Sequence, residues 1–250
     1  MDNTSYLSLS RIDGLTRALD VTANNLANAS TDGFKESRVQ FADYLSKQKG
    51  TQGAAGEKQL QYSQDRATYH NFDQGALRQT GNTLDLGLNG EGYFTVRTKN
   101  GIRLTRNGQF LRSDDGTITD SAGNPLLDQE GRNIRMDPEE VMEPLSISSG
   151  GIISTNRNGA LAQIAVVNVE NQNTLKAEGS DLYNPTTPTT AVASPEIRQG
   201  MLEASNVNAV QETTEMIRIQ RAYDLNFQVV QTESTRQLDA ISKITSEPNV

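Results

Sequence analysis

The most constraining feature of this sequence is a pair of helical apolar seams, one at each end of the chain. The first seam follows alternating steps of three and four residues and consists of Ile12, Leu15, Leu19 and Leu26, with Thr22 in register. Such steps place the residues on one face of a helix, as in a coiled coil. The absence of proline from Met1 to Asn28 therefore predicts a helix of about 25 residues, followed by a turn that ends at Gly33.

The second seam occupies the C-terminal fifth of the chain and is partly polar. It keeps the same rhythm through Met216, Gln220, Tyr223, Phe227, Val230, Ser234, Gln237, Ile241 and Ile244. Asn208, followed three residues later by Gln211, resembles a capping box at the start of a helix. We expect this helix to run for roughly 35 residues, against a mean of about 12 for globular proteins.

Between the seams, short β-branched and aromatic runs alternate with Asn-Gly and Asp-Gly pairs, which are strong hairpin signals. The predicted turns are Asn89-Gly90, Asn100-Gly101, Asn107-Gly108, Asp115-Gly116 and Asn158-Gly159. The predicted strands include Gly92 to Thr98, Ile102 to Thr105, Gln109 to Arg112, Thr117 to Thr119 and Leu161 to Val169. The expected fold is α+β: two long helices of coiled-coil type, pairing with each other and with neighbouring subunits, flank an inserted antiparallel, mainly β domain.

Four segments follow from these patterns. We expect an N-terminal helical domain at 1–33, an extended connecting region at 34–80, the β domain at 81–198 and a C-terminal helical domain at 199–250 that packs with 1–33. Within the connecting region, the stretch from Lys47 to Gln64 is rich in Gln, Gly and Ser and is predicted to be a polar linker or loop.

Composition excludes several classes of function. The net charge of −8 and the lack of a basic cluster disfavour nucleic-acid binding, which depends on clustered Lys and Arg. Without cysteine, and with His70 as the single histidine, the chain has little material for a thiol nucleophile, a zinc site or a catalytic triad. We therefore expect no catalytic, cofactor or metal site. The first 15 residues lack a basic region followed by an apolar stretch, so neither a cleaved signal nor membrane insertion is expected.

Three groups of residues could be interpreted as functional sites. Gly87, Gly90 and Gly92 resemble a dinucleotide fingerprint, but no helix is predicted after them, so turns are favoured. Asp114 and Asp115 could be paired carboxylates of a carbohydrate-cleaving enzyme, although adjacent residues before a glycine usually shape a turn. His70 is expected to be a surface or hydrogen-bonded residue.

The two seams allow two arrangements. The terminal helices could pack on one another in an ordinary monomer. Alternatively, because helices gain most of their stability from packing, they could become ordered on contact with other subunits and build an open-ended filament. A binding module that only templates such a filament is a third possibility. Periodicity alone leaves these possibilities open.

Four blocks of sequence resemble bacterial flagellar axial proteins, the family of rod, hook and hook-junction subunits. They are ANNLANASTDGFK at 23–35, LDLGLNGEGYF at 84–94, TRNGQF at 105–110, and QGMLEASNVN at 199–208 with QRAY at 220–223. The start MDNTSY, the segment 34–44 and the ending 237–244 resemble the proximal-rod, F-type branch of that family more than the distal-rod branch, with distal-rod or hook-type subunits as the alternative.

The resemblance implies a structural subunit of the basal-body rod that is exported through the flagellar secretion channel without a cleaved signal and lies in the periplasmic space. Its partners would be proximal and distal rod subunits, further copies of itself and the export apparatus. The residues expected at the assembly interface are Ile12, Leu15, Leu19, Asn24, Asn25, Leu26, Asn28, Met216, Tyr223, Phe227, Val230 and Ile241.

Overall fold

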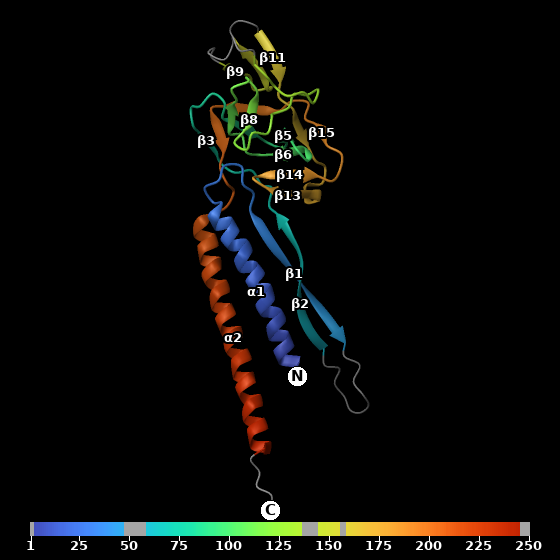
Figure 1. The fold of residues 1–250 in the computed structure, drawn as a ribbon, viewed down its shortest axis with the longest axis vertical. Helices are drawn as coiled ribbons and strands as arrows, with labels where there is room; N and C mark the ends of the chain where they lie inside the picture. Colours follow the sequence, from blue (N-terminus) through green and yellow to red (C-terminus); the bar gives the residue numbers. More distant parts are fainter. Residues whose placement is uncertain (1–2, 48–58, 137–144, 156–158, 246–250) are drawn as a thin grey trace, which may run out of the picture. The chain divides into compact units, whose positions relative to one another are not determined.

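The computed structural model describes residues 3–47, 59–136, 145–155 and 159–245, and it divides into two compact units (Figure 1). Unit 1 comprises residues 1–27, 37–69 and 208–250, and unit 2 comprises residues 28–36 and 70–207. The chain passes from one unit to the other four times, after Ala27, Glu36, Tyr69 and Val207. The predicted α+β class is confirmed, with a helix at each end and a mainly antiparallel β region between them.

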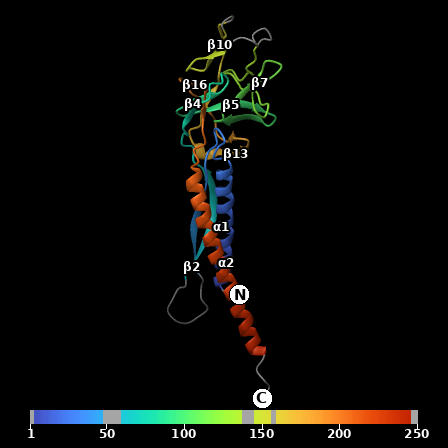
Figure 2. The ribbon, with the colours of Figure 1, turned by 90° about the vertical axis from the view of Figure 1, so that its left-hand side faces the viewer.

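Unit 1 is built on the two terminal helices. α1 (Asn3–Ala27) and α2 (Ala209–Thr245) lie side by side and run in opposite directions, as both ribbon views show (Figures 1 and 2). α1 ends one residue before the predicted boundary. As the capping pattern predicts, the side chain of Asn208 accepts hydrogen bonds from the backbone of Val210 at 3.1 Å and Gln211 at 3.3 Å.

Two strands complete unit 1. β1 (Ser37–Lys47) contacts α1 and pairs with β2 (Gln59–His70), whose last residue already belongs to unit 2. Most of the polar loop predicted from Lys47 to Gln64 lies outside the described residues, but its last six residues belong to β2 and not to a loop. A period-two alternation of Leu60 and Tyr62 with polar neighbours is compatible with a strand, and the glutamines around them concealed this signal.

Unit 2 contains a six-stranded antiparallel sheet in the order β13-β14-β6-β5-β12-β15. Its strands are β5 (Tyr93–Thr98), β6 (Gly101–Thr105), β12 (Val166–Asn168), β13 (Leu175–Gly179), β14 (Leu182–Pro185) and β15 (Thr190–Ala191). A short 3₁₀ helix, η2 (Gln172–Thr174), precedes β13.

Unit 2 also contains smaller antiparallel sheets. β9 (Leu145–Ile147), β10 (Ile152–Thr155) and β11 (Gly159–Gln163) form a three-stranded sheet. The remaining strands form the pairs β3 (Leu77–Gln79) with β17 (Met201–Glu203), β4 (Leu86–Asn89) with β16 (Glu196–Gln199), and β7 (Phe110–Arg112) with β8 (Ile118–Asp120).

Four of the five predicted strands match β5, β6, β7 and β8 to within one residue, and the fifth does not. The strand predicted from Leu161 to Val169 is two strands, because β11 pairs with β10 whereas β12 pairs with β5. Glycine is required in the predicted turn at Gly108 for lack of space. A Cβ there would lie 1.7 Å from the carbonyl oxygen of Leu86.

The apolar core is distributed unequally between the units. The larger cluster of unit 2 includes Phe94 and Phe110, whose rings meet edge to face at 5.5 Å, and a smaller cluster gathers around Tyr93 and Tyr183. Among the side chains whose burial the structure describes, Ile219 is the one buried hydrophobic residue of unit 1. Unit 2 therefore has a conventional core, whereas the side chains of unit 1 whose burial the structure describes bury little apolar surface.

Candidate functional site

The residues predicted at the interface differ widely in exposure. Asn25 is buried, whereas Asn24, Tyr223, Phe227 and Ile241 are exposed. The half-buried residues are Ile12, Leu15, Leu19, Leu26, Asn28, Met216 and Val230. All of them belong to unit 1 except Asn28, which lies in unit 2 and shapes the turn after α1 by accepting a hydrogen bond from the backbone of Thr31 at 3.1 Å.

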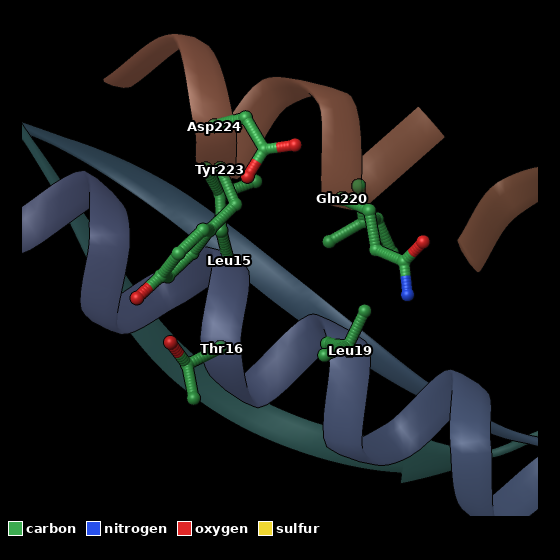
Figure 3. A pocket seen from close by; sticks show the side chains of 7 residues that line it. Leu15, Thr16, Leu19, Gln220, Tyr223 and Asp224 are labelled. Carbon is green, nitrogen blue, oxygen red and sulfur yellow. The ribbon is translucent and has the colours of Figure 1, made fainter. Parts of the chain in front are cut away.

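A surface pocket lies between the two helices of unit 1 (Figure 3). Its volume is about 220 Å³. The residues that line it are Leu15, Thr16 and Leu19 from α1, and Ile219, Gln220, Tyr223 and Asp224 from α2. Ile219 is buried, but Thr16, Gln220 and Asp224 are exposed, so the pocket is open at the surface of the helix pair.

The second predicted seam combines two faces of α2. Met216, Ile219 and Val230 are sheltered, together with the polar Asn226, and this face follows a heptad spacing towards α1. Phe227 stands beside that face and 47% of its surface is exposed. The sheltered face therefore packs within the subunit, whereas the side of α2 that carries Phe227 is exposed.

Further large apolar side chains on α2 are exposed. Leu225 is 63% exposed, Val229 48%, Leu238 64% and Ile241 58%. The rings of Tyr223 and Phe227 stack in parallel with their centroids 6.4 Å apart. Several exposed large apolar side chains on one helix are typical of a surface that binds another protein.

Asn25 joins α1 to β1 and α2. Its side-chain nitrogen donates to the carbonyl oxygen of Ser37 at 2.8 Å and to Glu212 Oε2 at 3.1 Å, and its oxygen accepts from the backbone nitrogen of Ser37 at 2.9 Å. One buried side chain on α1 thus holds the first residue of β1 and the first turn of α2.

In unit 2, the blocks singled out in the sequence meet at a buried charge cluster of Lys35, Glu203 and Arg106. Lys35 Nζ donates to Glu203 Oε1 at 2.5 Å, and Arg106 Nη1 donates to Glu203 Oε2 at 3.1 Å. The three side chains are 1%, 0% and 4% exposed, respectively. The backbone oxygens of Asp73 and Gly90 accept further bonds from Lys35 and Arg106 at 2.7 and 2.8 Å.

The electrostatics of this cluster follow from burial. Removal from water lowers the pKa of Lys35, because it disfavours the charged amine, and the neighbouring Glu203 carboxylate opposes this shift. Arg106 also lies over the ring of Tyr93, with 5.1 Å between Cζ and the ring centroid. Burial raises the pKa of the Tyr93 hydroxyl. The cluster therefore holds charges that depend on one another and have little contact with solvent.

Sequence reasoning did not single out this cluster, although Lys35, Arg106 and Glu203 each lie in a quoted block. The sequence carries no clear signal for the cluster, because its three residues lie far apart in the chain and in motifs that contain other polar residues. Of the two acidic residues considered as catalytic groups, Asp114 and Asp115, the second has hydrogen bonds that explain its place in the sequence. Asp115 accepts from the backbone and hydroxyl of Thr117 at 3.0 and 2.9 Å, which shapes a turn and lowers its pKa.

His70 is half-buried beside an aromatic group. Its ring centroid lies 5.9 Å from those of Phe72 and Tyr183. Burial lowers its pKa, with a smaller opposing contribution from a hydrogen bond to the backbone of Lys35.

Within the described residues, no helix combines the length and the apolar character of a membrane span. Three family models match the chain. Residues 9–35 match the flagella basal body rod protein, residues 87–155 the D1 domain of the flagellar hook protein FlgE/F/G, and residues 198–242 the C-terminal part of the flagellar basal body rod FlgEFG protein.

Comparison with whole proteins agrees with these matches. The chain is 39% identical to the flagellar basal-body rod protein FlgF of Caulobacter vibrioides over 90% of each chain. It is 31% identical to FlgF of Mesorhizobium japonicum over 99% of this chain and all of the relative, and 33% identical to the rod protein FlgG of Bacillus subtilis over 91% and 93%. The chain therefore belongs to the flagellar basal-body rod proteins, and within them it is of the FlgF type.

Proposed function

We propose that this chain, a structural subunit of the flagellar basal-body rod, joins its neighbours in the proximal rod through the terminal helices of unit 1. The observation that carries the proposal is the exposure of several large apolar side chains on α2, above all Phe227 at 47% and Ile241 at 58% exposure. Water is an unfavourable environment for these side chains, and packing against another subunit removes them from it.

The interface we propose consists of the twelve residues named from the sequence, in two roles. The half-buried members on α1 and α2 pair the two helices in the manner of a coiled coil, in keeping with the three-four spacing of their side chains. Asn25 ties α1 to β1 and α2, and Asn28 shapes the turn after α1. The exposed members contact neighbouring subunits. Rod subunits related to this one, other copies of the chain and the export apparatus are the proposed partners.

Export and location belong to the same proposal. A chain without cysteine passes through a secretion channel with no disulfide to reduce, which suits a subunit delivered unfolded to the periplasmic part of the rod without a cleaved signal. We also propose that the chain is not an enzyme. This is supported by membership of a structural family and by the turn-shaping hydrogen bonds of Asp115. The alternative within the family is a distal-rod subunit, since FlgG relatives also match most of the chain.

The substitution Phe227→Asp tests the proposed interface. The side chain is half exposed in the subunit, so the fold should tolerate Asp, but a charge buried without a partner in an assembled rod costs several kcal/mol. In a bacterium that lacks its own copy of the gene, we expect loss of swimming and loss of the variant from purified basal bodies, measured by immunoblot.

Gln228→Asp is the matched control, because it introduces the same charge at the next, exposed position. It should restore swimming. Incorporation of Phe227→Asp at the level of this control would remove α2 from the proposed interface, whereas absence of even the unmodified chain from basal bodies would contradict the proposed function itself.

A further inference from the structure

The sequence contains four Asn-Gly pairs, and such pairs are chemically reactive as well as turn-forming. The backbone nitrogen of the glycine can attack Cγ of the asparagine, because glycine has no Cβ to hinder the approach. Ammonia leaves with the proton of that nitrogen, and a five-membered succinimide ring remains. Water then opens the ring at either carbonyl group, which gives aspartate or isoaspartate. The reaction therefore requires that the side chain and the attacking nitrogen are both free to move.

Hydrogen bonds hold both reacting groups of the Asn89-Gly90 pair. The side-chain nitrogen of Asn89 donates to Glu196 Oε2 at 2.8 Å, and the backbone nitrogen of Gly90 donates to Gln74 Oε1 at 2.9 Å. Asn89 is also the last residue of β4, where it pairs with Glu196 of β16. The nitrogen that would attack and the amide that would be attacked are therefore each bound to another residue.

The Asn107-Gly108 pair is held by a hydrogen bond and by close packing. Asn107 Oδ1 accepts from the backbone nitrogen of Gln109 at 3.0 Å. The backbone of Gly108 is fixed against β4, because its oxygen accepts from the backbone nitrogen of Leu86 at 3.0 Å. A Cβ on Gly108 would lie 1.7 Å from the Leu86 oxygen. This packing opposes the backbone rotation that would bring the Gly108 nitrogen to the side chain.

Asn100 lies at the exposed end of the β5–β6 hairpin. Lys99 and Asn100 join the two strands, and the last pair of the hairpin is Thr98 with Gly101. Asn100 and Gly101 are both exposed, and within the described part of the chain no hydrogen bond holds the side-chain amide of Asn100. A Cβ on Gly101 would meet the end of the Arg103 side chain at 3.5 Å and no backbone atom within 4 Å. Because the end of a hairpin opens at low cost in free energy, breaking one pair frees the nitrogen of Gly101.

We propose that Asn100 is a site of spontaneous deamidation, whereas the fold protects Asn89 and Asn107. Asn158, in the fourth pair, lies outside the described residues. Deamidation replaces the neutral amide of Asn100 by a carboxylate at the exposed end of the hairpin, and isoaspartate also lengthens the backbone by one carbon atom. The surface charge of unit 2 therefore changes as the protein ages. This inference goes beyond the proposed function and does not depend on it.

Peptide mapping of the full chain tests this site. The purified protein is kept at physiological temperature and mildly alkaline pH, and mass spectrometry follows the peptides that contain Asn89, Asn100 and Asn107. We expect the Asn100 peptide to gain about one mass unit and to separate into an aspartate and an isoaspartate form. Asn89 and Asn107 should react about tenfold more slowly or less, because the fold must open further to release them. In urea the three rates should become similar. Equal rates in the folded chain would overturn the proposal, as would a folded chain in which Asn100 stays intact.

Two variants test the reason for the difference. Gln74 is exposed, so the fold should tolerate Gln74→Ala, which releases the backbone nitrogen of Gly90 from its hydrogen bond. We expect faster deamidation at Asn89 in this variant and an unchanged rate at Asn100. Asn100→Gln is the matched control, because it keeps an amide but cannot form the five-membered ring, so the mass increase at residue 100 should disappear. An unchanged rate at Asn89 would refute protection by the hydrogen bond, and a persistent mass increase at residue 100 would refute the succinimide route.

Discussion

Both carboxylate oxygens of Glu203 accept hydrogen bonds from buried cations, one from Lys35 and the other from Arg106. Oε1 also accepts from the backbone nitrogen of Gly75 at 2.9 Å. A buried pair adds little net stability when intact, because desolvation offsets the attraction, but removal of one partner leaves an uncompensated charge. Here a single carboxylate balances two cations, so we expect its loss to lower the stability of unit 2 strongly.

Glu203→Gln preserves the shape of the side chain and removes this balance. We expect unit 2 to lose about 3–5 kcal/mol of unfolding free energy. Urea denaturation followed by tyrosine fluorescence measures it. Glu196→Gln is the control, because its partnership with Arg198 is exposed and should contribute less than about 1 kcal/mol. Equal denaturation midpoints for the two variants would contradict the balancing role of Glu203.

Gly33 is a second position at which the structure accepts only one type of residue. Its φ is +78°, and a Cβ would lie 2.5 Å from the backbone nitrogen of Asn107. Gly81 has nearly the same φ, +77°, with no atom within 4 Å of a Cβ. Gly33→Ala combines left-handed strain with a backbone clash, whereas Gly81→Ala has only the strain of about 1–2 kcal/mol.

We therefore expect thermal unfolding of the Gly33→Ala variant at a clearly lower temperature than that of Gly81→Ala, measured by circular dichroism. If both variants melted together, the close approach of residues 33 and 107 would not matter for stability. The sequence predicts a turn at Gly33, because the preceding Ser, Thr and Asp favour it. It cannot predict the clash, since that depends on where a distant segment of the chain passes.

At the scale of elements, the three-four spacing predicts the existence and length of both helices well. It is less informative about which face of each helix is buried. Met216 and Val230 are sheltered, whereas Phe227 lies on an exposed flank, although all three fit one rhythm. Polar residues contribute to the sheltered face of α2 as well, with Glu212 buried and Asn226 half-buried, and an apolar pattern cannot register them. Periodicity thus predicts that a helix has a partner, but it does not identify the side that meets the partner.

Asn25 shows how polar groups hold these elements together. Replacement by Ala leaves the backbone of Ser37 and the carboxylate of Glu212 without this partner, and an unsatisfied buried polar group costs about 1–3 kcal/mol. We expect the Asn25→Ala variant to lose helical signal in circular dichroism at a lower urea concentration than the unmodified chain. The neighbouring, exposed Asn24→Ala should lose its helical signal at a higher urea concentration than Asn25→Ala. Unfolding of both variants at the same urea concentration would show that the hydrogen bonds of Asn25 do not stabilise unit 1.

At the scale of the whole molecule, the distribution of apolar burial predicts two levels of stability. Unit 2 contains nearly all of the described core, and the helices of unit 1 expose much of their apolar surface. Hydrogen exchange of the dilute chain should be fast in α1 and α2 and slow in β5 and β6, because local opening requires less energy where fewer apolar contacts are lost. Protection of both helices should increase with protein concentration as copies associate.

Uniform slow exchange at all concentrations would instead indicate a self-contained fold, and the role of assembly in ordering the helices would need revision. The sequence predicts this contrast only in outline. The seams indicate that the terminal helices pack against a partner. How much of their apolar surface is buried within the subunit depends on contacts with β1 and between the helices. Those contacts join segments far apart in the sequence.

The four passages of the chain between the two units have a mechanical consequence for a structural subunit of the rod. Torsion applied to one unit reaches the other along four peptide segments in parallel, at residues 27–28, 36–37, 69–70 and 207–208. A linker of one segment would concentrate the whole load on a few rotatable bonds, and a single cut would separate the parts. Here a cut at any one passage leaves three covalent connections between the units.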